Sequence, residues 1–255
     1  MAETRDYVSH FDPEVYLKSL YESMGSYEKG DIACFLQNTL HKIFNSEIQF
    51  GEKLLDIGSG PTIQSVLSAS RRITRIDLTD FTPKNLQVLR DWKDGKRNEV
   101  EKLIRYEMKL AGDSRNVSER ESEVRSKVHG IYRIDATTEQ VFKESIPDDP
   151  QYDVITSSLC LEDVSTTLAG YKTAVRNVSK YLKKGGYFVL LGVIEESKYR
   201  IGDYIFLGTS LKAEEIRATW REHGFKILQW ISDYPEDAAE SKDVDNFFGM
   251  LAKKE

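Results

Sequence analysis

The chain has 255 residues, of which 40% are hydrophobic and 31% are charged, and it carries a formal net charge of −6 at pH 7. This length is enough for one large α/β domain, and the acidic balance argues against a nucleic-acid or anionic-membrane partner, which would favour a basic face. The sequence contains no apolar run of roughly 20 residues that would span a bilayer, and its first residues lack the apolar core of a signal peptide.

The first part of the chain differs in pattern from the rest. Residues 11–46 are predicted to form helices with an aromatic-rich face, whose members are Phe11, Tyr16, Tyr21, Phe35 and Phe44. After Gly51 the pattern changes to strands that alternate with helices. The strands are predicted at residues 53–57, 73–79, 129–134, 152–157 and 187–194. The helices are predicted to begin near Pro61 and to cover residues 83–92, 165–183 and 212–223.

Three further segments complete the predicted fold. Residues 94–127 are strongly charged and are predicted to form a solvated helix or an insertion. Residues 199–211 are predicted to form a hairpin or cap, and residues 225–231 and 246–251 the final strands. Alternating strands and helices imply a mostly parallel sheet, and two last strands close in sequence fit an antiparallel hairpin at one edge. The predicted fold is therefore α/β, a Rossmann-like three-layer sandwich formed as one domain by residues 1–255.

The first strand runs into a glycine turn that has the pattern of a nucleoside-binding corner. Gly58 and Gly60 remove side chains, so that backbone can approach a ligand closely. A dinucleotide fingerprint would need a third glycine, where this chain has Ile63. Pro61 also removes one N–H donor from the helix start, where a pyrophosphate would need it. The corner therefore points away from NAD and toward S-adenosylmethionine, which has no phosphate.

Acidic residues follow the predicted strands on the same edge of the sheet. Asp80 closes the second strand and is suited to accept hydrogen bonds from both ribose hydroxyls. Asp77 is the alternative, but the two-residue alternation of a strand places it mid-strand, where a structural salt bridge is expected. Asp135 closes the third strand and is suited to accept from the adenine amino group.

Several segments of the chain resemble the small-amine methyltransferases, which include nicotinamide, phenylethanolamine, indolethylamine and thioether methyltransferases. The similar motifs are Asp-Ile-Gly-Ser-Gly-Pro-Thr (56–62), Thr-Asp-Phe-Thr-Pro-Lys-Asn-Leu (79–86), Ser-Leu-Cys-Leu-Glu (158–162) and Glu-Glu-Ser-Lys-Tyr-Arg-Ile-Gly (195–202). Residues 7–16 resemble the lid segment of that family. The resemblance implies lid helices within residues 1–50 and a cap at about 195–211, and it is weakest over residues 94–127.

The resemblance also implies residues that bind S-adenosylmethionine. Tyr16 and Tyr21 would close over the cofactor, while Gly58, Ser59 and Gly60 would contact its methionine part.

The remaining cofactor contacts that the resemblance implies lie at later strand ends. Asp80 and Asn85 would bind the ribose, Asp135 and Ala136 the adenine, and Ser158 the amino-acid end. The family commonly has a tyrosine where this chain has Gln64, whose amide is still able to hydrogen-bond a carboxylate.

Two glutamates are the candidate catalytic residues. Glu162 and Glu196 each follow a predicted strand at the carboxyl edge of the sheet. A carboxylate beside an amine attracts its cation and accepts its proton, directly or through water. A lone glutamate in a loop is more often a solvated side chain, but in the phenylethanolamine enzyme glutamates at these motif positions bracket the substrate amine. Tyr199 would bind substrate with Tyr16, and Tyr204 would extend this aromatic wall, unless these rings serve only packing.

The resemblance favours a cationic amine over nicotinamide as the acceptor. An aspartate that holds the carboxamide in the nicotinamide enzyme falls where this chain has Gly192. A third acid of the phenylethanolamine enzyme aligns ambiguously with Lys242 or Asp243. The predicted activity is methyl transfer from S-adenosylmethionine to a small aromatic amine. The alternatives are a nicotinamide or pyridine N-methyltransferase, and a protein of the same fold that binds the cofactor without turnover.

The two cysteines, Cys34 and Cys160, have the spacing of neither a metal site nor a disulfide framework. We therefore expect a cytoplasmic protein without a metal. The resemblance favours a monomer.

Overall fold

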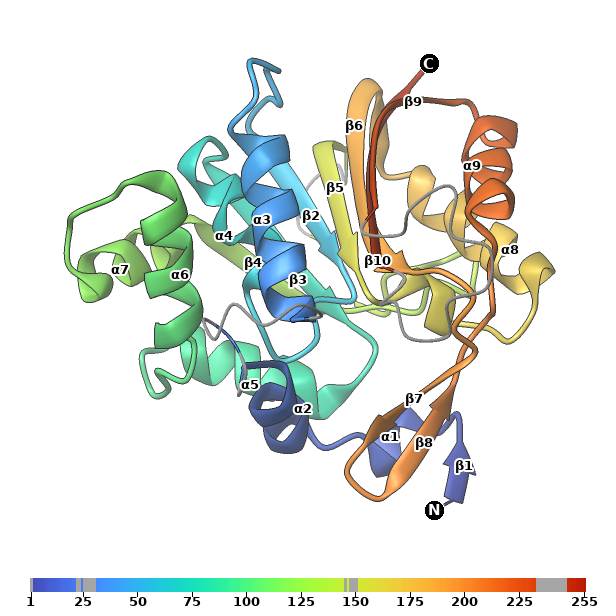
Figure 1. The fold of residues 1–255 in the computed structure, drawn as a ribbon, viewed down its shortest axis with the longest axis horizontal. Helices are drawn as coiled ribbons and strands as arrows, with labels where there is room; N and C mark the ends of the chain where they lie inside the picture. The colour runs from blue at the N-terminus through green and yellow to red at the C-terminus, as the bar shows by residue number, and fades with distance from the viewer. Residues whose placement is uncertain (1, 22–23, 25–30, 145, 147–150, 233–246) are drawn as a thin grey trace.

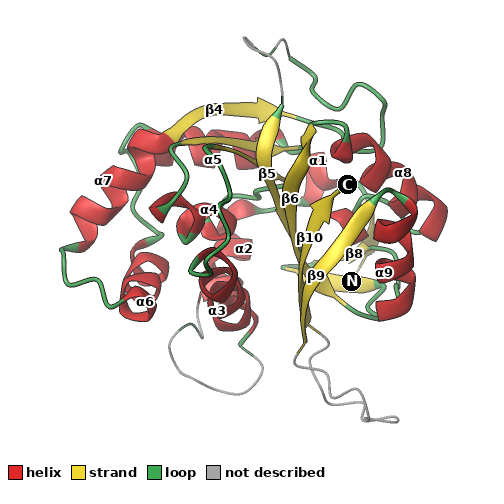
Figure 2. Ribbon diagram, turned by 90° about the horizontal axis from the view of Figure 1, so that it is seen from above, coloured by secondary structure: helices red, strands yellow, loops and turns green. Residues whose placement is uncertain are grey.

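The computed structural model describes residues 2–21, 24, 31–144, 146, 151–232 and 247–255. Its central element is a sheet of seven strands (Figures 1 and 2). In order across the sheet the strands are β4 (Val128–Arg133), β3 (Arg75–Asp80), β2 (Lys53–Ile57), β5 (Tyr152–Ser158), β6 (Leu182–Val193), β10 (Phe247–Lys254) and β9 (Phe225–Ser232). β10 is antiparallel to both of its neighbours, whereas the pairs among β4, β3, β2, β5 and β6 are parallel. The predicted sandwich with an antiparallel hairpin at one edge is confirmed.

Helices cover both faces of this sheet, and the strand alternation explains the division. Leu54 of β2 contributes to one core cluster and its neighbour Leu55 to the other. The first face carries α2 (Pro13–Tyr21), α3 (Ile32–Phe44), α4 (Gln64–Leu67), α5 (Pro83–Lys93), α6 (Glu101–Ala111) and α7 (Val117–Lys127). The second face carries α8 (Leu168–Ser179) and α9 (Ala213–Glu222), as Figure 2 shows.

A second, smaller sheet lies at the end of the molecule toward which the parallel strands of the main sheet point (Figure 1). β7 (Lys198–Ile201) and β8 (Tyr204–Leu207) form the predicted hairpin. β1 (Ala2–Thr4) pairs in parallel with β8, an association that the sequence does not indicate. The chain then enters α1 (Tyr7–His10), so the start of the chain and the cap hairpin form one unit.

Local polar side chains set several helix boundaries. Asp31 accepts a hydrogen bond from the Cys34 N–H at the start of α3, and Asn116 accepts one from the Glu119 N–H at the start of α7. Thr167 caps α8 in the same way at the Gly170 N–H. α8 therefore begins at Leu168 rather than at residue 165.

Some predicted boundaries are wrong. The predicted helix 165–183 ends at Ser179. Its last predicted residues, Leu182 and Lys183, lie within β6, which shifts its register against β5 before Tyr187. The helix expected near Pro61 begins at Gln64, because the preceding residues form the turn that fastens β2 to β3. The last strand begins at Phe247; residue 246, like Lys242 and Asp243, is outside the described residues.

The charged segment 94–127 is not the solvated helix that its composition predicts. It forms α6 and α7, whose apolar side chains, among them Leu103 and Ile104, join the core on the first face of the sheet. Arg120 and Glu107 have no exposed surface and form an ion pair at 3.4 Å that Arg71 shares. The Arg120 guanidinium also donates to the Leu67 carbonyl at 2.6 Å. The charges of this segment therefore fasten α6 and α7 to the body of the domain.

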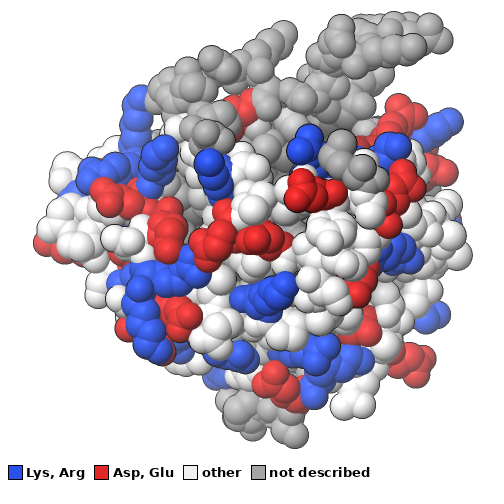
Figure 3. All heavy atoms as spheres, turned by 90° about the horizontal axis from the view of Figure 1, so that it is seen from below, with Lys and Arg blue, Asp and Glu red and all other residues white. Residues whose placement is uncertain are grey.

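Charged side chains of both signs are interspersed over the face of the molecule seen from below (Figure 3). Within the described ranges, no helix is long and apolar enough to cross a membrane.

We predict that Arg120→Met lowers the free energy of unfolding by roughly 3–5 kcal/mol, because it removes one partner of a buried ion pair. The control is Arg105→Met, which removes an exposed pair with Glu101 on α6 and should cost less than about 1 kcal/mol. Urea denaturation of both variants measures the difference. Equal losses would contradict a fastening role for the buried pair.

Candidate active site

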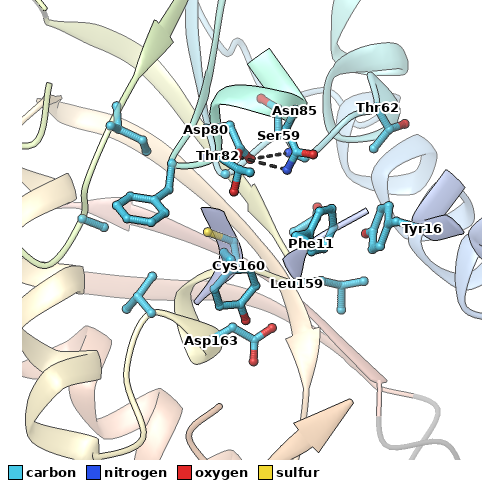
Figure 4. A pocket seen from close by; sticks show the side chains of 18 of the residues that line it. Phe11, Tyr16, Ser59, Thr62, Asp80, Thr82, Asn85, Leu159, Cys160 and Asp163 are labelled. Atoms are coloured by element: carbon cyan, nitrogen blue, oxygen red, sulfur yellow. Dashed lines mark hydrogen bonds between the residues drawn. The ribbon is translucent and has the colours of Figure 1, made fainter. Parts of the chain in front are cut away.

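A pocket of about 300 Å³ lies at the carboxyl ends of the parallel strands. The chain passes from β2 outward to β3 and β4, and then returns to place β5 on the other side of β2. Ligands of open α/β sheets bind at such a switch point, beyond the carboxyl ends of the strands. Residues after β2, β3, β4 and β5 line this pocket, and the N-terminal segment supplies Tyr7, Phe11 and Tyr16 (Figure 4).

The glycine turn after β2 is fastened to the end of β3. Gly58 and Gly60 both adopt left-handed backbone, with φ of +69° and +63°. The Ser59 N–H donates to the Thr79 carbonyl at 2.7 Å, and the Gly60 N–H donates to Asp80 Oδ2 at 2.8 Å. A Cβ atom on Gly58 would lie 2.1 Å from Cys160 Sγ, whereas one on Gly60 would have no atom closer than 3.9 Å. Gly58 thus lets two strand ends approach each other, whereas a Cβ atom at residue 60 would only come into van der Waals contact with the Tyr16 ring.

Asp80 is the central polar residue of this turn. Besides the Gly60 N–H, its carboxylate accepts from the Thr82 N–H at 2.7 Å and from Asn85 Nδ2 at 3.1 Å. Burial raises the pKa of this carboxyl, and the hydrogen bonds from Thr82 and Gly60 oppose that rise. Asp77 lies mid-strand, accepts from the Tyr152 hydroxyl and pairs with Arg75, as predicted for a structural acid.

Two polar atoms of the pocket lining have no partner. Asn85 Oδ1 and Ser158 Oγ are buried and make no hydrogen bond within the part of the chain that the structure describes. A buried polar atom without a partner is costly, so these atoms mark places where a ligand would supply hydrogen bonds. Asn85 lies in the first turn of α5, and Ser158 is the last residue of β5.

The predicted adenine contacts line the same pocket. Asp135 follows β4 and accepts from the Thr137 N–H at 2.9 Å. The Ala136 carbonyl is held by Asn177 Nδ2 at 3.0 Å. Gln64 also lines the pocket, and its side-chain amide nitrogen donates to the Ala33 carbonyl at 2.7 Å, so its orientation is set by α3.

The two lid tyrosines occupy different places. Tyr16 lines the pocket, with its ring 5.3 Å from that of Phe11. Tyr21 is buried behind the lining, where its hydroxyl hydrogen-bonds the Thr62 hydroxyl. Tyr21 therefore supports the pocket wall through Thr62.

The lid contacts the cap through aromatic side chains. The Tyr199 hydroxyl donates to the Tyr7 hydroxyl at 3.0 Å, and the rings of Tyr7 and Phe206 lie 4.7 Å apart. Tyr199 lines the pocket, whereas the ring of Tyr204 lies against His10 at 4.3 Å. Tyr7 and Phe11 are site residues that no sequence motif predicts individually, although both fall in the segment that resembles a family lid.

The predicted catalytic glutamates lie beside the pocket rather than among the described residues that line it. Glu162 is buried and accepts from the Val193 N–H at 3.3 Å. Burial, reinforced by the charge of Glu196, raises the pKa of Glu162 to about 7. Glu196 is exposed after β6. The acid that lines the pocket at this end is Asp163, which the sequence analysis left unassigned within a polar stretch.

Comparison with solved structures defines the class to which this fold belongs. The structure titled "[4+2]-Cyclase SpnF" has a TM-score of 0.58 at 16% identity and covers 99% of this chain and 96% of its own. CalS10, an amino pentose methyltransferase from Micromonospora echinaspora, has a TM-score of 0.52 at 14% identity and covers 94% of this chain and 97% of its own. At these identities the likeness shows the fold alone, which is that of class I methyltransferases.

Sequence comparison then places the chain in a family. The model of the NNMT/PNMT/TEMT family matches residues 1–255. Human nicotinamide N-methyltransferase is 32% identical, covering 97% of this chain and 94% of its own length. Rabbit (Oryctolagus cuniculus) indolethylamine N-methyltransferase is 30% identical, covering 88% of this chain and 86% of its own length. The phenylethanolamine N-methyltransferase of Macaca mulatta is 29% identical, covering 85% of this chain and 78% of its own length. The chain belongs to the NNMT/PNMT/TEMT family of S-adenosylmethionine-dependent methyltransferases, as the motifs predicted.

We predict that Gly58→Ala destabilises the protein more than Gly60→Ala does. Left-handed backbone costs either alanine about 1–2 kcal/mol, but only residue 58 would also collide with Cys160, which should add roughly 1–3 kcal/mol. Thermal and urea unfolding of both variants, without ligand, measure this difference. Equal losses would contradict the close approach of the two strand ends.

The raised pKa of Glu162 predicts a pH dependence of stability. Between about pH 4.5 and 7 the folded protein retains a proton that the unfolded chain has released, so the free energy of unfolding should fall as pH rises through this range. Glu162→Gln removes this titration and retains an acceptor for the Val193 N–H. The free energy of unfolding of the variant minus that of wild type should therefore increase by on the order of 3 kcal/mol from pH 5 to pH 8, measured by urea unfolding at each pH. A constant difference between the two proteins would contradict the raised pKa.

Proposed function

We propose that this protein is an S-adenosylmethionine-dependent N-methyltransferase that acts on a small, cationic aromatic amine. One observation carries the proposal: a single pocket joins the nucleoside corner around Asp80 to an end lined by tyrosines and by Asp163, in a chain of this family. The pocket therefore offers room for a cofactor and an acceptor in contact with each other.

The described residues fit S-adenosylmethionine. Asn85 Oδ1, the buried atom without a partner, is placed to accept from a ribose hydroxyl beside Asp80. Ser158 Oγ is placed to bond the amino-acid end of the cofactor, and Asp135 the adenine amino group. When bound, the cofactor supplies an electrophilic methyl group on a sulfonium. Because Gly60 has no side chain beside the Tyr16 ring, this ring would remain accessible for a contact with the positive sulfur.

The acceptor end has the groups that amine methylation needs. An alkylamine is protonated near neutral pH and must lose that proton to become a nucleophile. Glu162, with a pKa of about 7, is suited to take the proton, directly or through water, because a general base works best near the operating pH. Glu196 contributes a second negative charge beside it. The main task of the remaining residues is to align the two reactants.

The packing around Glu162 supports a cationic acceptor over nicotinamide. A Cβ atom on Gly192 would lie 2.5 Å from Glu162 Oε1. An aspartate at this position, as in the nicotinamide enzyme, would therefore require the Glu162 carboxylate to move from its present place. Sequence identity does not separate the candidates, because the nicotinamide, indolethylamine and phenylethanolamine enzymes lie at 32%, 30% and 29%.

Calorimetry with S-adenosylmethionine, followed by an assay for S-adenosylhomocysteine over a panel of amines, tests the proposal. The panel contains phenylethanolamines, tyramine, indolethylamines and pyridines. We expect cofactor binding and the fastest turnover with an alkylamine. Turnover with pyridines alone would favour nicotinamide-type methylation, and binding without turnover on the whole panel would favour a binding protein.

We predict that Asp80→Ala weakens S-adenosylmethionine binding at least about 100-fold, because three donors lose the acceptor that orders the corner. Asp94→Ala, at the exposed end of α5, removes an equal charge and should bind normally. Calorimetry compares the two variants. Binding by Asp80→Ala at the wild-type affinity would contradict the assignment.

We predict that Glu162→Gln and Glu196→Ala bind the cofactor within twofold of wild type. Turnover of the preferred amine should fall about 100-fold or more in Glu162→Gln, since general-base catalysis contributes factors of about 10²–10⁴. Steady-state kinetics at saturating cofactor measure this loss. Unchanged turnover in either variant would remove that residue from the acceptor site.

A further inference from the structure

We infer that Asp163 binds the acceptor's ammonium group and selects cationic over neutral acceptors. The inference rests on the proposed function and adds to it a specificity residue that lies in the pocket itself. Asp163 ends the short 3₁₀ helix Leu161–Asp163 after β5. In Figure 4 its carboxylate lies across the pocket from Asp80, with Cys160 between them.

Backbone hydrogen bonds fix the main chain at Asp163. The Asp163 N–H donates to the Cys160 carbonyl at 2.9 Å, and the Thr209 N–H donates to the Glu162 carbonyl at 2.8 Å. This second bond brings the end of the cap against the 3₁₀ helix. A Cβ atom on Gly208 would lie 2.2 Å from Asp163 Oδ1. Glycine at 208 thus leaves room for the carboxylate.

Asp163 differs from the other acids that line the pocket. Asp80 accepts three hydrogen bonds, and Asp135 accepts from Thr137. No donor in the described part of the chain hydrogen-bonds to the Asp163 carboxylate. Asp163 is half-buried and its carboxylate opens to the pocket, so a bound cation would supply the partner that it lacks among the described residues.

Three tyrosines line the same pocket as this carboxylate. Burial raises the pKa of Tyr7, Tyr16 and Tyr199, and the charge of Asp163 is the next largest cause for all three. Its charge therefore acts on three tyrosines of the pocket lining. Ring faces together with a carboxylate form a suitable environment for an ammonium group attached to an aromatic body.

The nearby charges leave this end of the pocket negative. Arg5 is the cation among the described lining residues, and its guanidinium donates to the Val164 carbonyl at 2.7 Å. Burial raises the pKa of Asp163 well above its ordinary value. The negative charges of Glu162 and Glu196 add to this rise in pKa, and the positive charge of Arg5 opposes it. A cationic acceptor relieves this repulsion on binding, whereas a neutral pyridine does not.

The test compares Asp163→Asn with Asp203→Asn, which removes an equal charge at the exposed turn of the cap hairpin. Calorimetry on protein loaded with S-adenosylhomocysteine measures binding of phenylethylamine, a cation, and of quinoline, a neutral ring; no reaction occurs without a methyl donor. We expect Asp163→Asn to lower the affinity for phenylethylamine at least about 30-fold and the affinity for quinoline less than threefold. Cofactor affinity should stay within twofold, and Asp203→Asn should match wild type.

Kinetics separate this inference from the proposed function. In Asp163→Asn the KM for the cationic amine should rise far more than kcat falls. If Asp163→Asn changed the affinity for both ligands equally, or changed neither, the inference would be overturned. Turnover by the wild-type protein would still support the proposed function in that case. Wild type that binds no cationic amine would also overturn the inference. Wild type that binds the amine but transfers no methyl group would refute the function, and selective loss in Asp163→Asn would still support the cation site.

Discussion

The site depends on one buried carboxylate, that of Asp80, which fastens the glycine turn after β2 to the end of β3. Its oxygens accept from the Gly60 and Thr82 N–H groups and from Asn85, so two strand ends and the start of α5 share a single acceptor. A charge-assisted hydrogen bond is stronger than a neutral one, and it is stronger still where water is excluded. The same bonds leave Asn85 Oδ1 without a partner, and this atom is where the cofactor's ribose would add its own hydrogen bond.

The other end of the pocket differs, because the acid that lines it lacks the donors that stabilise Asp80. Backbone N–H groups, among them that of Val193 at 3.3 Å, donate to Glu162 beside the pocket, whereas no donor in the described part of the chain hydrogen-bonds to the Asp163 carboxylate. Burial beside Glu196 raises the pKa of both carboxyls. One end of the pocket is thus ordered before a ligand arrives, and the other end is suited to gain a positive charge. This difference accounts for a cofactor bound by fixed geometry and an acceptor selected by charge.

The sequence predicted those parts of the fold and site that depend on local pattern. The glycine turn, the strand-end acids Asp80 and Asp135 and the cap hairpin all follow from residue type and spacing along the chain. The sequence did not predict the features that depend on distant partners. β1 pairs with a strand some 200 residues later, Tyr21 is turned toward Thr62, and Arg120 is buried by Glu107 despite the charge of its segment. The family motif singles out Glu162 and ends before Asp163, and the residue pattern does not show that the 3₁₀ helix brings Asp163 into the pocket lining.

The central claim is that cofactor and amine react within this one pocket, and isotope transfer tests it most directly. Wild-type protein is incubated with S-adenosylmethionine that carries a deuterated methyl group and with the best amine of the panel, and the product is analysed by mass spectrometry. The account predicts one deuterated methyl group on the amine nitrogen for each S-adenosylhomocysteine formed. Cofactor that is bound but returned intact, or a label found on an atom other than nitrogen, would contradict it.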